Sequence, residues 1–306
     1  MRPLLASIEQ DEAAILACVG SDGVEFALPS STPGEVHGVE YIDAADCPTF
    51  TDALMRFASA HRLVLRDCRL IMSVAGAVNG ATVRTTNGRW FISLSGLRAV
   101  TGVEPLILND VAAMAWATAE RPRAAPYGVA ADHGRPQKGR HAVISAWRGG
   151  LGAACVDRCD GFLKIVESEA GHMPFAAQTE DQWLMAKACI ARHGDASYER
   201  ILFALMDGQA LHRPIVGSEL NDLFVTLLGH YSAAVTLTYT AWDGLYLCGS
   251  VFERIASPAY AGAFRTAFEG QGKLRAMLQQ TPSQMFQMRN GSLSGLSILY
   301  SRTRKG

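Results

Sequence analysis

The chain has 306 residues, 49% of them apolar, and its 28 basic residues nearly balance its 29 acidic residues. A chain of this length can bury two moderate hydrophobic cores, so we expect two lobes. The near-zero net charge disfavours nucleic acid and anionic lipid as partners and favours a small neutral molecule. No stretch reaches the roughly 18 uninterrupted apolar residues of a membrane span, so no membrane partner is expected.

The cysteines indicate a reducing compartment. There are seven, an odd number spread along the chain, and Met1–Leu5 is too short for the apolar core of a secretory leader. We therefore expect reduced thiols and a cytoplasmic protein. Cys155 and Cys159 are spaced C-x3-C, without a second cysteine pair and without a histidine at the spacing of a zinc finger. This pattern favours buried thiols over a zinc site.

Strand and helix patterns alternate through the first 110 residues. Ser21-Asp22-Gly23 is a strong turn signal and predicts a hairpin. The elements expected in chain order are strands at 13–19 and 23–28, a helix at 49–60, strands at 69–75 and 80–86, a helix at 94–101 and a strand at 105–108.

The second half of the chain continues the alternation after a surface loop, rich in Pro, Gly, Arg and Ala, that is expected at 121–139. The elements expected there are strands at 142–145 and 153–156 around a glycine turn at 149–152, mostly helix at 180–236, and a buried strand at 245–247. Such an order predicts an α/β layer architecture with a central sheet.

One junction singles out a carboxylate. The apolar strand pattern Leu106-Ile107-Leu108 ends on Asn109-Asp110 and opens at once into a helix pattern. The amides and dipole of a helix N-terminus stabilise a carboxylate there, and a carboxylate can bind and deprotonate a sugar hydroxyl. A plain helix cap explains the same pattern, and on frequency alone it is the more common explanation.

A second cluster lies in the turn-like segment Ser168-Glu169-Ala170-Gly171-His172. A carboxylate and an imidazole three residues apart can bind neighbouring ring hydroxyls, because together they supply acceptors and donors. For an isolated pattern of this kind, a surface glutamate and a structural histidine are the more common explanation. Spacing alone does not show whether this cluster lies near Asp110.

Both clusters resemble motifs of the bacterial glucokinase family, within the hexokinase–actin superfamily. The family's I-N-D strand end is similar to Leu108-Asn109-Asp110, and its G-E-G-G-H-x-x-F/L motif is similar to residues 168–175. Its F-R-x-A-F segment resembles residues 264–268, and its T-N-x-x-W segment resembles residues 86–90. The similarity runs in the family's order from about residue 5 to about residue 299.

The resemblance implies an α/β, two-lobed actin-like ATPase (ribonuclease H-like) sugar kinase fold with an interlobe cleft. It implies a small α/β lobe from residues 1–109, completed by about residues 290–306, and a large α/β lobe from residues 110–289. Closure of such a cleft on a sugar would exclude water from the transfer. Homodimers are common in the family.

By the same resemblance, Asp110 is the general base on the 6-hydroxyl of glucose, and Glu169 and His172 hold the lower-numbered hydroxyls. Glu199 matches the family's S-x-E-R-V/I-L segment, although by itself it would be a surface residue of a helix. The sugar-binding residues that the resemblance implies are Asn87, Asn109, Asp110, Glu169, His172 and Glu199.

The family's N-terminal phosphate-binding turn, D-x-G-G-T-N, is altered in this chain. It corresponds to Ser7-Ile8-Glu9-Gln10-Asp11-Glu12, which lacks both glycines. This segment also places three carboxylates at the position where the polyphosphate of a nucleotide would lie. The family's S-G-x-G turn after the Glu199 segment is replaced by Phe203-Ala204-Leu205-Met206, which is typical of a continuing helix.

Two other glycine segments are partly kept. The family's G-T-G-L-G loop corresponds to residues 148–152. The sequence there fits a glycine turn that binds no anion as well as it fits a phosphate-binding loop. The adenosine segment corresponds to residues 243–250 and keeps one glycine of each pair. The family implies ATP and Mg²⁺, and no residue is assigned to a metal. The predicted nucleotide-binding residues are Gly149, Gly150, Gly152 and Gly249.

Two functions therefore stay open. The first is ATP-dependent phosphorylation of glucose or a related hexose, which the presence of Asp110 favours. The second is a noncatalytic sugar-binding regulator or sensor, which the acidic segment Glu9–Glu12 favours, because its charge opposes a nucleotide. On electrostatics alone, weak or absent kinase activity is slightly favoured. A repressor role is disfavoured, because Met1–Ile8 leaves no room for a helix-turn-helix.

Overall fold

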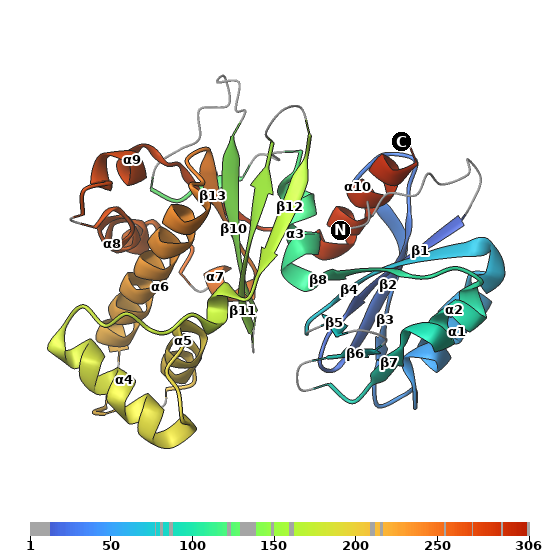
Figure 1. Cartoon of the computed structure of the whole chain (residues 1–306), viewed down its shortest axis with the longest axis horizontal. Helices are drawn as coiled ribbons and strands as arrows, with labels where there is room; N and C mark the ends of the chain where they lie inside the picture. The colour runs from blue at the N-terminus through green and yellow to red at the C-terminus, as the bar shows by residue number, and fades with distance from the viewer. Residues whose placement is uncertain are drawn as a thin grey trace. The chain divides into compact units, whose positions relative to one another are not determined.

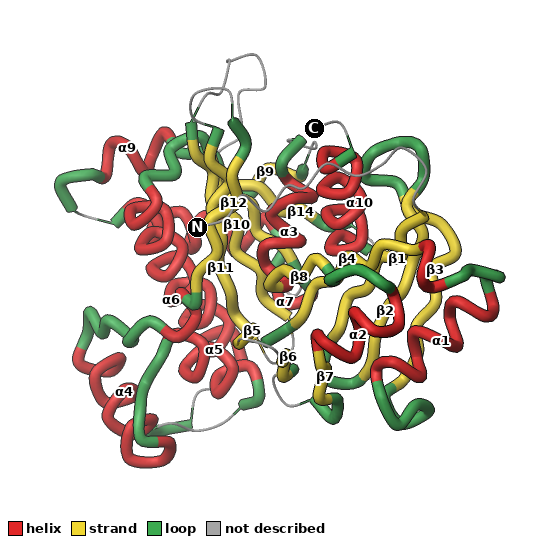
Figure 2. Tube along the Cα trace, turned by 45° about the vertical axis from the view of Figure 1, so that its right-hand side comes forward, coloured by secondary structure: helices red, strands yellow, loops and turns green. Residues whose placement is uncertain are grey.

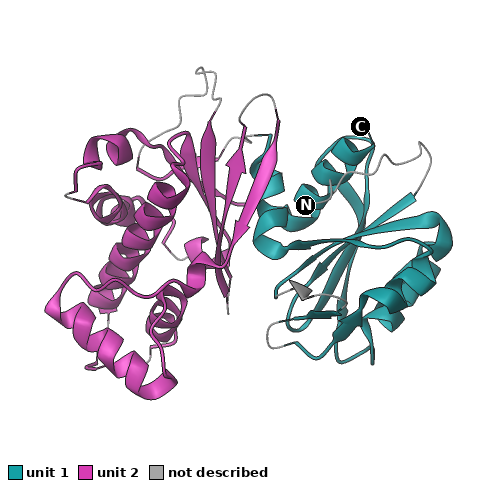
Figure 3. Cartoon of the chain, in the orientation of Figure 1, with its two compact units in different colours: residues 1–122, 288–306 teal, residues 123–287 magenta. Residues whose placement is uncertain are grey.

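The computed structural model divides the chain into two compact units (Figure 1). It describes residues 13–76, 78–79, 82–85, 88–120, 124–128, 139–147, 150–158, 162–208, 212–214, 217–253, 255–270, 272–288 and 290–304. Unit 1 is Met1–Pro122 with Met288–Gly306, and unit 2 is Arg123–Gln287 (Figure 3). The division after Pro122 differs from the boundary expected after Asn109, because the helix that begins at Asp110 packs within unit 1.

The described strands of unit 1 form a five-stranded sheet with the order β3-β2-β1-β4-β8 and a small three-stranded sheet, β5-β6-β7. The strands are β1 Ala13–Val19, β2 Gly23–Pro29, β3 Val36–Asp43, β4 Cys68–Val74, β5 Val78–Asn79, β6 Thr82–Arg84, β7 Phe91–Ser93 and β8 Leu106–Asn109. The helices are α1 Phe50–Ala60, the 3-10 turn η1 Leu65–Asp67, α2 Leu94–Thr101, α3 Asp110–Thr118 and α10 Gly291–Thr303.

Alternation along the strands gives the five-stranded sheet two covered faces. Ile15 and Ala17 of β1 share a core with α1, where Phe57 is fully buried. The intervening Leu16 belongs to a second core with Ala113 of α3 and Leu296 of α10. The helices α3 and α10 lie next to each other, as Figure 2 also shows. The sheet is therefore packed between helices on both faces.

Unit 2 is built on a six-stranded sheet with the order β12-β11-β10-β13-β14-β9. The strands are β9 Ala125–Pro126, β10 Arg140–Trp147, β11 Gly150–Asp157, β12 Lys164–Ser168, β13 Gly244–Cys248 and β14 Ser283–Phe286. The helices are the 3-10 turn η2 Ala170–His172, α4 Glu180–His193, α5 Tyr198–Met206, α6 Gly217–Tyr239, α7 Ser250–Glu253, α8 Pro258–Glu269 and α9 Arg275–Gln280. Its core joins β10, β11 and β13 to α5, α6 and α8.

The local patterns predicted these elements well. The hairpin around Ser21-Asp22-Gly23 is confirmed by β1 and β2, and the helices expected at 49–60 and 94–101 are confirmed by α1 and α2. The helix expected to continue through Leu205 and Met206 is confirmed by α5. The sequence patterns missed β3, β7, β9, β12 and β14, which have short or interrupted apolar alternation, and they set no bounds for the helices α7 to α10. Within the described residues, no helix has the length and apolar character needed to cross a membrane.

Candidate active site

Asp110 stands where three parallel strands end. The register pairs Val19 of β1 with Val74 of β4, and Val74 with Asn109 of β8, so the carboxyl ends of these strands are level. Ligand sites of α/β sheets lie at such ends. The strand-to-helix junction expected at Asn109-Asp110 is confirmed, since β8 ends at Asn109 and α3 begins at Asp110.

Asn109 caps helix α3. Its Oδ1 accepts a 2.8 Å hydrogen bond from the amide of Val111, and Oδ1 of Asp110 accepts from the same amide at 2.9 Å. The helix cap that the sequence pattern also allowed is therefore formed by Asn109. Asp110 occupies the first turn, where the helix dipole stabilises a carboxylate.

A thiol that the sequence did not single out lies within the electrostatic reach of Asp110. Burial raises the pKa of Cys18, at the end of β1, to about 12, and a hydrogen bond from Ser73 offsets part of this shift. The carboxylates of Glu25 and Asp110 raise that pKa further. The negative charge of Asp110, which follows β8, therefore acts on a thiol at the end of β1, two strands away in the sheet.

In unit 2, His172 lies between two carboxylates. Its Nε2 is 3.9 Å from Oε2 of Glu169, and its Nδ1 is 3.7 Å from Oε1 of Glu199. The side chains of Glu169 and His172 are 69% and 62% exposed, while that of Glu199 is 21% exposed. The three residues, which were predicted from two separate motifs, therefore converge, with Glu199 on the inner side and the other two open to a ligand.

Backbone pairing after η2 explains this convergence. The amide of Phe175 donates to the carbonyl of Ala196 at 2.9 Å, and the amide of Tyr198 donates to the carbonyl of Met173 at 3.1 Å. The rings of Phe175 and Tyr198 pack edge to face with centroids 5.2 Å apart. These contacts hold the start of α5, which carries Glu199, next to the segment that carries His172.

The same carboxylate is bonded to the predicted phosphate loop. Oε2 of Glu199 accepts a 2.8 Å hydrogen bond from the amide of Leu151 in β11. The carbonyl of Leu151 lies close to Gly171, whose backbone packs so tightly that a Cβ there would lie 1.7 Å from the carbonyl oxygen. The backbone of Leu151 therefore contacts Glu199 through its amide and Gly171, in the segment that carries Glu169 and His172, through its carbonyl. These are backbone contacts, which the apolar side chain of Leu151 does not predict.

The predicted glycines divide into described and undescribed positions. Gly150 and Gly152 lie at the start of β11. Gly249 follows β13 with φ of +108°, and a Cβ there would lie 2.3 Å from the carbonyl oxygen of Ala146, so only glycine fits this turn. Gly149, with Arg148, lies outside the described residues.

Two other predicted segments also lie outside the described residues. They are Asn87, expected in the sugar cleft, and the acidic N-terminal segment that includes Glu9 and Glu12. Among the predicted sugar-binding residues, Asn109 and Asp110 belong to unit 1, and Glu169, His172 and Glu199 belong to unit 2. In the part of the chain that is described, no group of three or more His, Cys, Asp or Glu residues is arranged to hold a metal ion.

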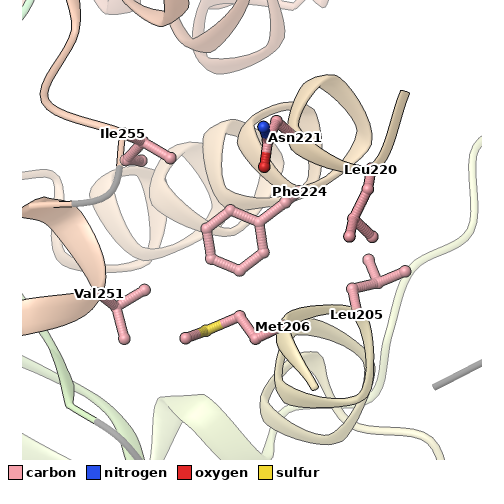
Figure 4. A pocket seen from close by; sticks show the side chains of 7 residues that line it. All are labelled: Leu205, Met206, Leu220, Asn221, Phe224, Val251 and Ile255. Carbon is pink, nitrogen blue, oxygen red and sulfur yellow. The ribbon is translucent and has the colours of Figure 1, made fainter. Parts of the chain in front are cut away.

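A pocket in unit 2 adjoins the Gly249 turn (Figure 4). It encloses about 300 Å³ of space, counting its open mouth. Its lining residues are Leu205, Met206, Leu220, Asn221, Phe224, Val251 and Ile255. The pocket thus joins α7, directly after Gly249, to the end of α5, where the sequence departs from the family's glycine turn. Local sequence patterns do not predict this pocket, because its lining comes from separated segments.

The glucokinase family model matches residues 15–205 and 206–303. The chain belongs to the glucokinase family. It is 26% identical over 321 residues to a glucokinase of Helicobacter acinonychis (strain Sheeba), a match that covers 93% of this chain and 94% of that protein.

The match to the bifunctional protein glk of Burkholderia thailandensis has 25% identity over 322 residues. It covers 96% of this chain but 49% of that protein, so the chain spans about half the length of that relative. The crystal structure of a glucokinase from an Antarctic psychrotroph matches with a TM-score of 0.75 and 20% identity, covering 96% of this chain and 100% of that one. The expected glucokinase-type α/β fold is confirmed.

Proposed function

We propose that the protein phosphorylates glucose or a related hexose at the 6-hydroxyl, with ATP as the phosphoryl donor. The observation that carries the proposal is the cluster of Glu169, His172 and Glu199, three residues from two separate motifs that meet at one place in unit 2. Membership of the glucokinase family supports the same activity.

In this proposal the cluster holds the sugar through its lower-numbered hydroxyls. Exposed Glu169 accepts hydrogen bonds from hydroxyl groups, and the His172 imidazole supplies a donor or an acceptor. Glu199 has one oxygen bonded to the Leu151 amide, which fixes the carboxylate and leaves its other oxygen on the His172 side. A fixed carboxylate loses little conformational freedom when it binds a ligand.

Asp110 is proposed as the general base, with Asn109 and Asn87 as further sugar contacts. The 6-hydroxyl oxygen forms a bond to the γ-phosphorus, the bond to the β,γ-bridging oxygen breaks, and ADP leaves. The hydroxyl proton passes to Asp110 and then to solvent. In phosphoryl transfer most of the rate comes from positioning and charge stabilisation, so the base chiefly orients the hydroxyl.

For the donor, Gly149, Gly150 and Gly152 are proposed to approach the phosphates, and the Gly249 turn is proposed to adjoin the nucleoside. The apolar pocket beside Gly249 supports a nucleoside there, because small-molecule sites are concave and mostly apolar. Magnesium that accompanies a nucleotide takes most of its ligands from phosphates and water. The proposal therefore assigns no residue of the described chain to the metal.

A second function, a noncatalytic sugar sensor, is favoured by one sequence feature. The segment Glu9–Glu12 carries three carboxylates at the family's N-terminal phosphate-binding turn. Like charges there would oppose a nucleotide. A sensor of this kind would bind sugar through the same cluster of Glu169, His172 and Glu199 and transfer no phosphate.

The test incubates the purified protein with Mg-ATP and glucose, mannose or fructose, and follows the hexose 6-phosphate by ³¹P NMR. The proposal predicts a 6-phosphate from at least one hexose. In parallel, calorimetry measures glucose binding without nucleotide. Glucose binding with no phosphate transfer would replace the kinase by the sensor, and no hexose binding at all would overturn both functions.

A further inference from the structure

The side chain of Tyr231, in α6, is fully buried in the hydrophobic core of unit 2. Within the described residues, its hydroxyl oxygen has no hydrogen-bond partner. A buried hydroxyl without a partner destabilises a folded protein, so nearly all such groups bind either another protein group or an ordered water molecule. The groups that surround the Tyr231 hydroxyl therefore indicate what it binds.

Tyr231 packs against the start of α5, the helix that carries Glu199. The ring centroids of Tyr231 and Tyr198 are 5.4 Å apart, and Tyr198 directly precedes Glu199 in the chain. Burial raises the pKa of Tyr231, and the charges of Tyr239 and Glu199 raise it further. The Glu199 carboxylate is therefore within electrostatic reach of the Tyr231 hydroxyl, although the two form no direct hydrogen bond.

A second tyrosine hydroxyl of α6 belongs to the same surroundings. The hydroxyl of Tyr239 forms no hydrogen bond of ordinary geometry within the described residues. Burial raises the pKa of Tyr239, and the hydroxyl of Ser168 lies near enough to lower it in part. Ser168 ends β12, directly before Glu169, and donates a 2.7 Å hydrogen bond to the carbonyl of Ala153. Tyr239 therefore joins the surroundings of Tyr231 to the strand end that leads into the sugar cluster.

We infer that Tyr231 is a positioning residue of the sugar site, whose hydroxyl orients the Glu199 carboxylate through one buried water molecule. The inference rests on the proposed function, in which Glu199 binds the hexose. A buried water molecule typically needs about two to four polar partners. The Glu199 carboxylate and the hydroxyls of Tyr231 and Tyr239 are suitable partners for it. Hydrogen bonds through such a water are nearly as favourable as direct ones.

The contacts of Glu199 leave room for this additional donor. Oε2 accepts from the Leu151 amide, and Oε1 lies 3.7 Å from Nδ1 of His172. Each carboxylate oxygen accepts more than one hydrogen bond, so a water held by Tyr231 displaces neither contact. Hydrogen bonds to an ionised carboxylate are among the stronger ones, and a fixed acceptor loses little conformational freedom when it binds a ligand. Loss of the Tyr231 hydroxyl should therefore weaken glucose binding.

The test is calorimetric titration of the intact protein with glucose, applied to Tyr231→Phe, Glu199→Gln and the double variant. We expect Tyr231→Phe to bind glucose about fivefold more weakly, the effect of one hydrogen bond. In the Glu199→Gln background the same change should weaken binding by less than about twofold, because the charged acceptor is already gone. The matched control is Tyr127→Phe, which removes a buried hydroxyl that donates to the carbonyl of Ile255 at 2.9 Å. It should leave glucose affinity unchanged.

Circular dichroism establishes that each variant is folded. If Tyr231→Phe is not folded, Tyr239→Phe decides the result, with an expected loss of glucose affinity of at least about twofold. Unchanged affinity in Tyr231→Phe, or an equal loss in both backgrounds, would overturn the inference, because the hydroxyl would then act independently of Glu199. In that case ATP-dependent glucose phosphorylation by the same preparation would show that the proposed function still stands. If the unchanged protein binds no hexose, the proposed sugar site fails and the inference fails with it.

Discussion

The backbone amide of Leu151 donates a 2.8 Å hydrogen bond to Oε2 of Glu199. Leu151 belongs to the glycine segment predicted to approach phosphates, and Glu199 belongs to the cluster predicted to bind the sugar. The backbone of Gly171 packs against the carbonyl of the same residue, Leu151. Within unit 2, the two predicted halves of the site therefore share one backbone residue.

The first prediction concerns the Glu199 carboxylate. Glu199→Ala leaves the partly buried Leu151 amide without its acceptor and removes a partner of His172. We expect glucose affinity to fall at least about tenfold, whereas Glu199→Gln, which keeps an acceptor for the amide, should lose less. Calorimetric titration with glucose measures both, with the exposed Glu180→Ala as control. Unchanged affinity in Glu199→Ala would exclude this residue from the sugar site.

The second prediction contrasts two glycines. Gly171→Ala places a Cβ 1.7 Å from the carbonyl oxygen of Leu151, so the backbone must shift. Gly150→Ala meets nothing within 4 Å. We expect Gly171→Ala to lose about 1–3 kcal/mol of stability and to weaken glucose binding, and Gly150→Ala to preserve both. Thermal unfolding and glucose titration check this, and equal effects of the two substitutions would contradict the packing described for Leu151.

The third prediction assigns a structural role to Arg265, which lies in a segment that resembles the family's F-R-x-A-F motif. Its side chain is 8% exposed and donates to Glu269, to the hydroxyl of Ser283 and to three backbone carbonyls between residues 278 and 281. Arg265→Met removes all of these hydrogen bonds from a largely buried position and should cost about 3 kcal/mol of unfolding free energy. Urea unfolding measures it, and the exposed Lys273→Met should change it by less than about 0.5 kcal/mol.

The fourth prediction uses the thiol at the end of β1. Because burial, with contributions from Glu25 and Asp110, raises the pKa of Cys18 to about 12, the thiol stays protonated at pH 9 and should react slowly with iodoacetamide. Asp110→Asn removes a negative charge that disfavours the thiolate, so the pKa of Cys18 falls and the reaction at pH 9 becomes faster.

Peptide mapping by mass spectrometry follows the alkylation of Cys18 by itself. Asp22→Asn, a charge change that does not contribute to the pKa of Cys18, is the control and should leave the rate unchanged. A Cys18 that reacts at pH 9 as fast in the folded protein as in urea would contradict the burial of this thiol. Equal rates for Asp110→Asn and the unchanged protein would contradict the proximity of Asp110.

Local patterns predicted the parts of the site that depend on neighbours in sequence. The end of an apolar strand fixed the junction at Asn109-Asp110, and the turn residues around Gly171 indicated the segment of Glu169 and His172. Glu199 was identified by resemblance alone, because a polar residue in the first turn of a helix carries no signal of its own.

The remaining features depend on contacts between distant segments. The bond between Leu151 and Glu199 spans 48 residues and uses a backbone amide, which has no signature in sequence. The pocket beside Gly249 likewise gathers residues from Leu205 to Ile255, and each of its apolar residues is separately typical of a hydrophobic core. The short strand β12 pairs with β11, and β14 pairs with β13 and β9, which are pairings that alternation within one strand does not show.

The most direct test of the account is the rate of ATP-dependent glucose phosphorylation by the unchanged protein and by Asp110→Asn, measured side by side with glucose affinity. Asparagine keeps the size of the side chain and an acceptor for the Val111 amide but cannot take a proton. The account predicts turnover in the unchanged protein and a fall of at least about a hundredfold in the variant, with glucose affinity kept within about tenfold. Undiminished turnover in Asp110→Asn would contradict the role of Asp110, and no turnover by the folded, glucose-binding unchanged protein would contradict the kinase itself.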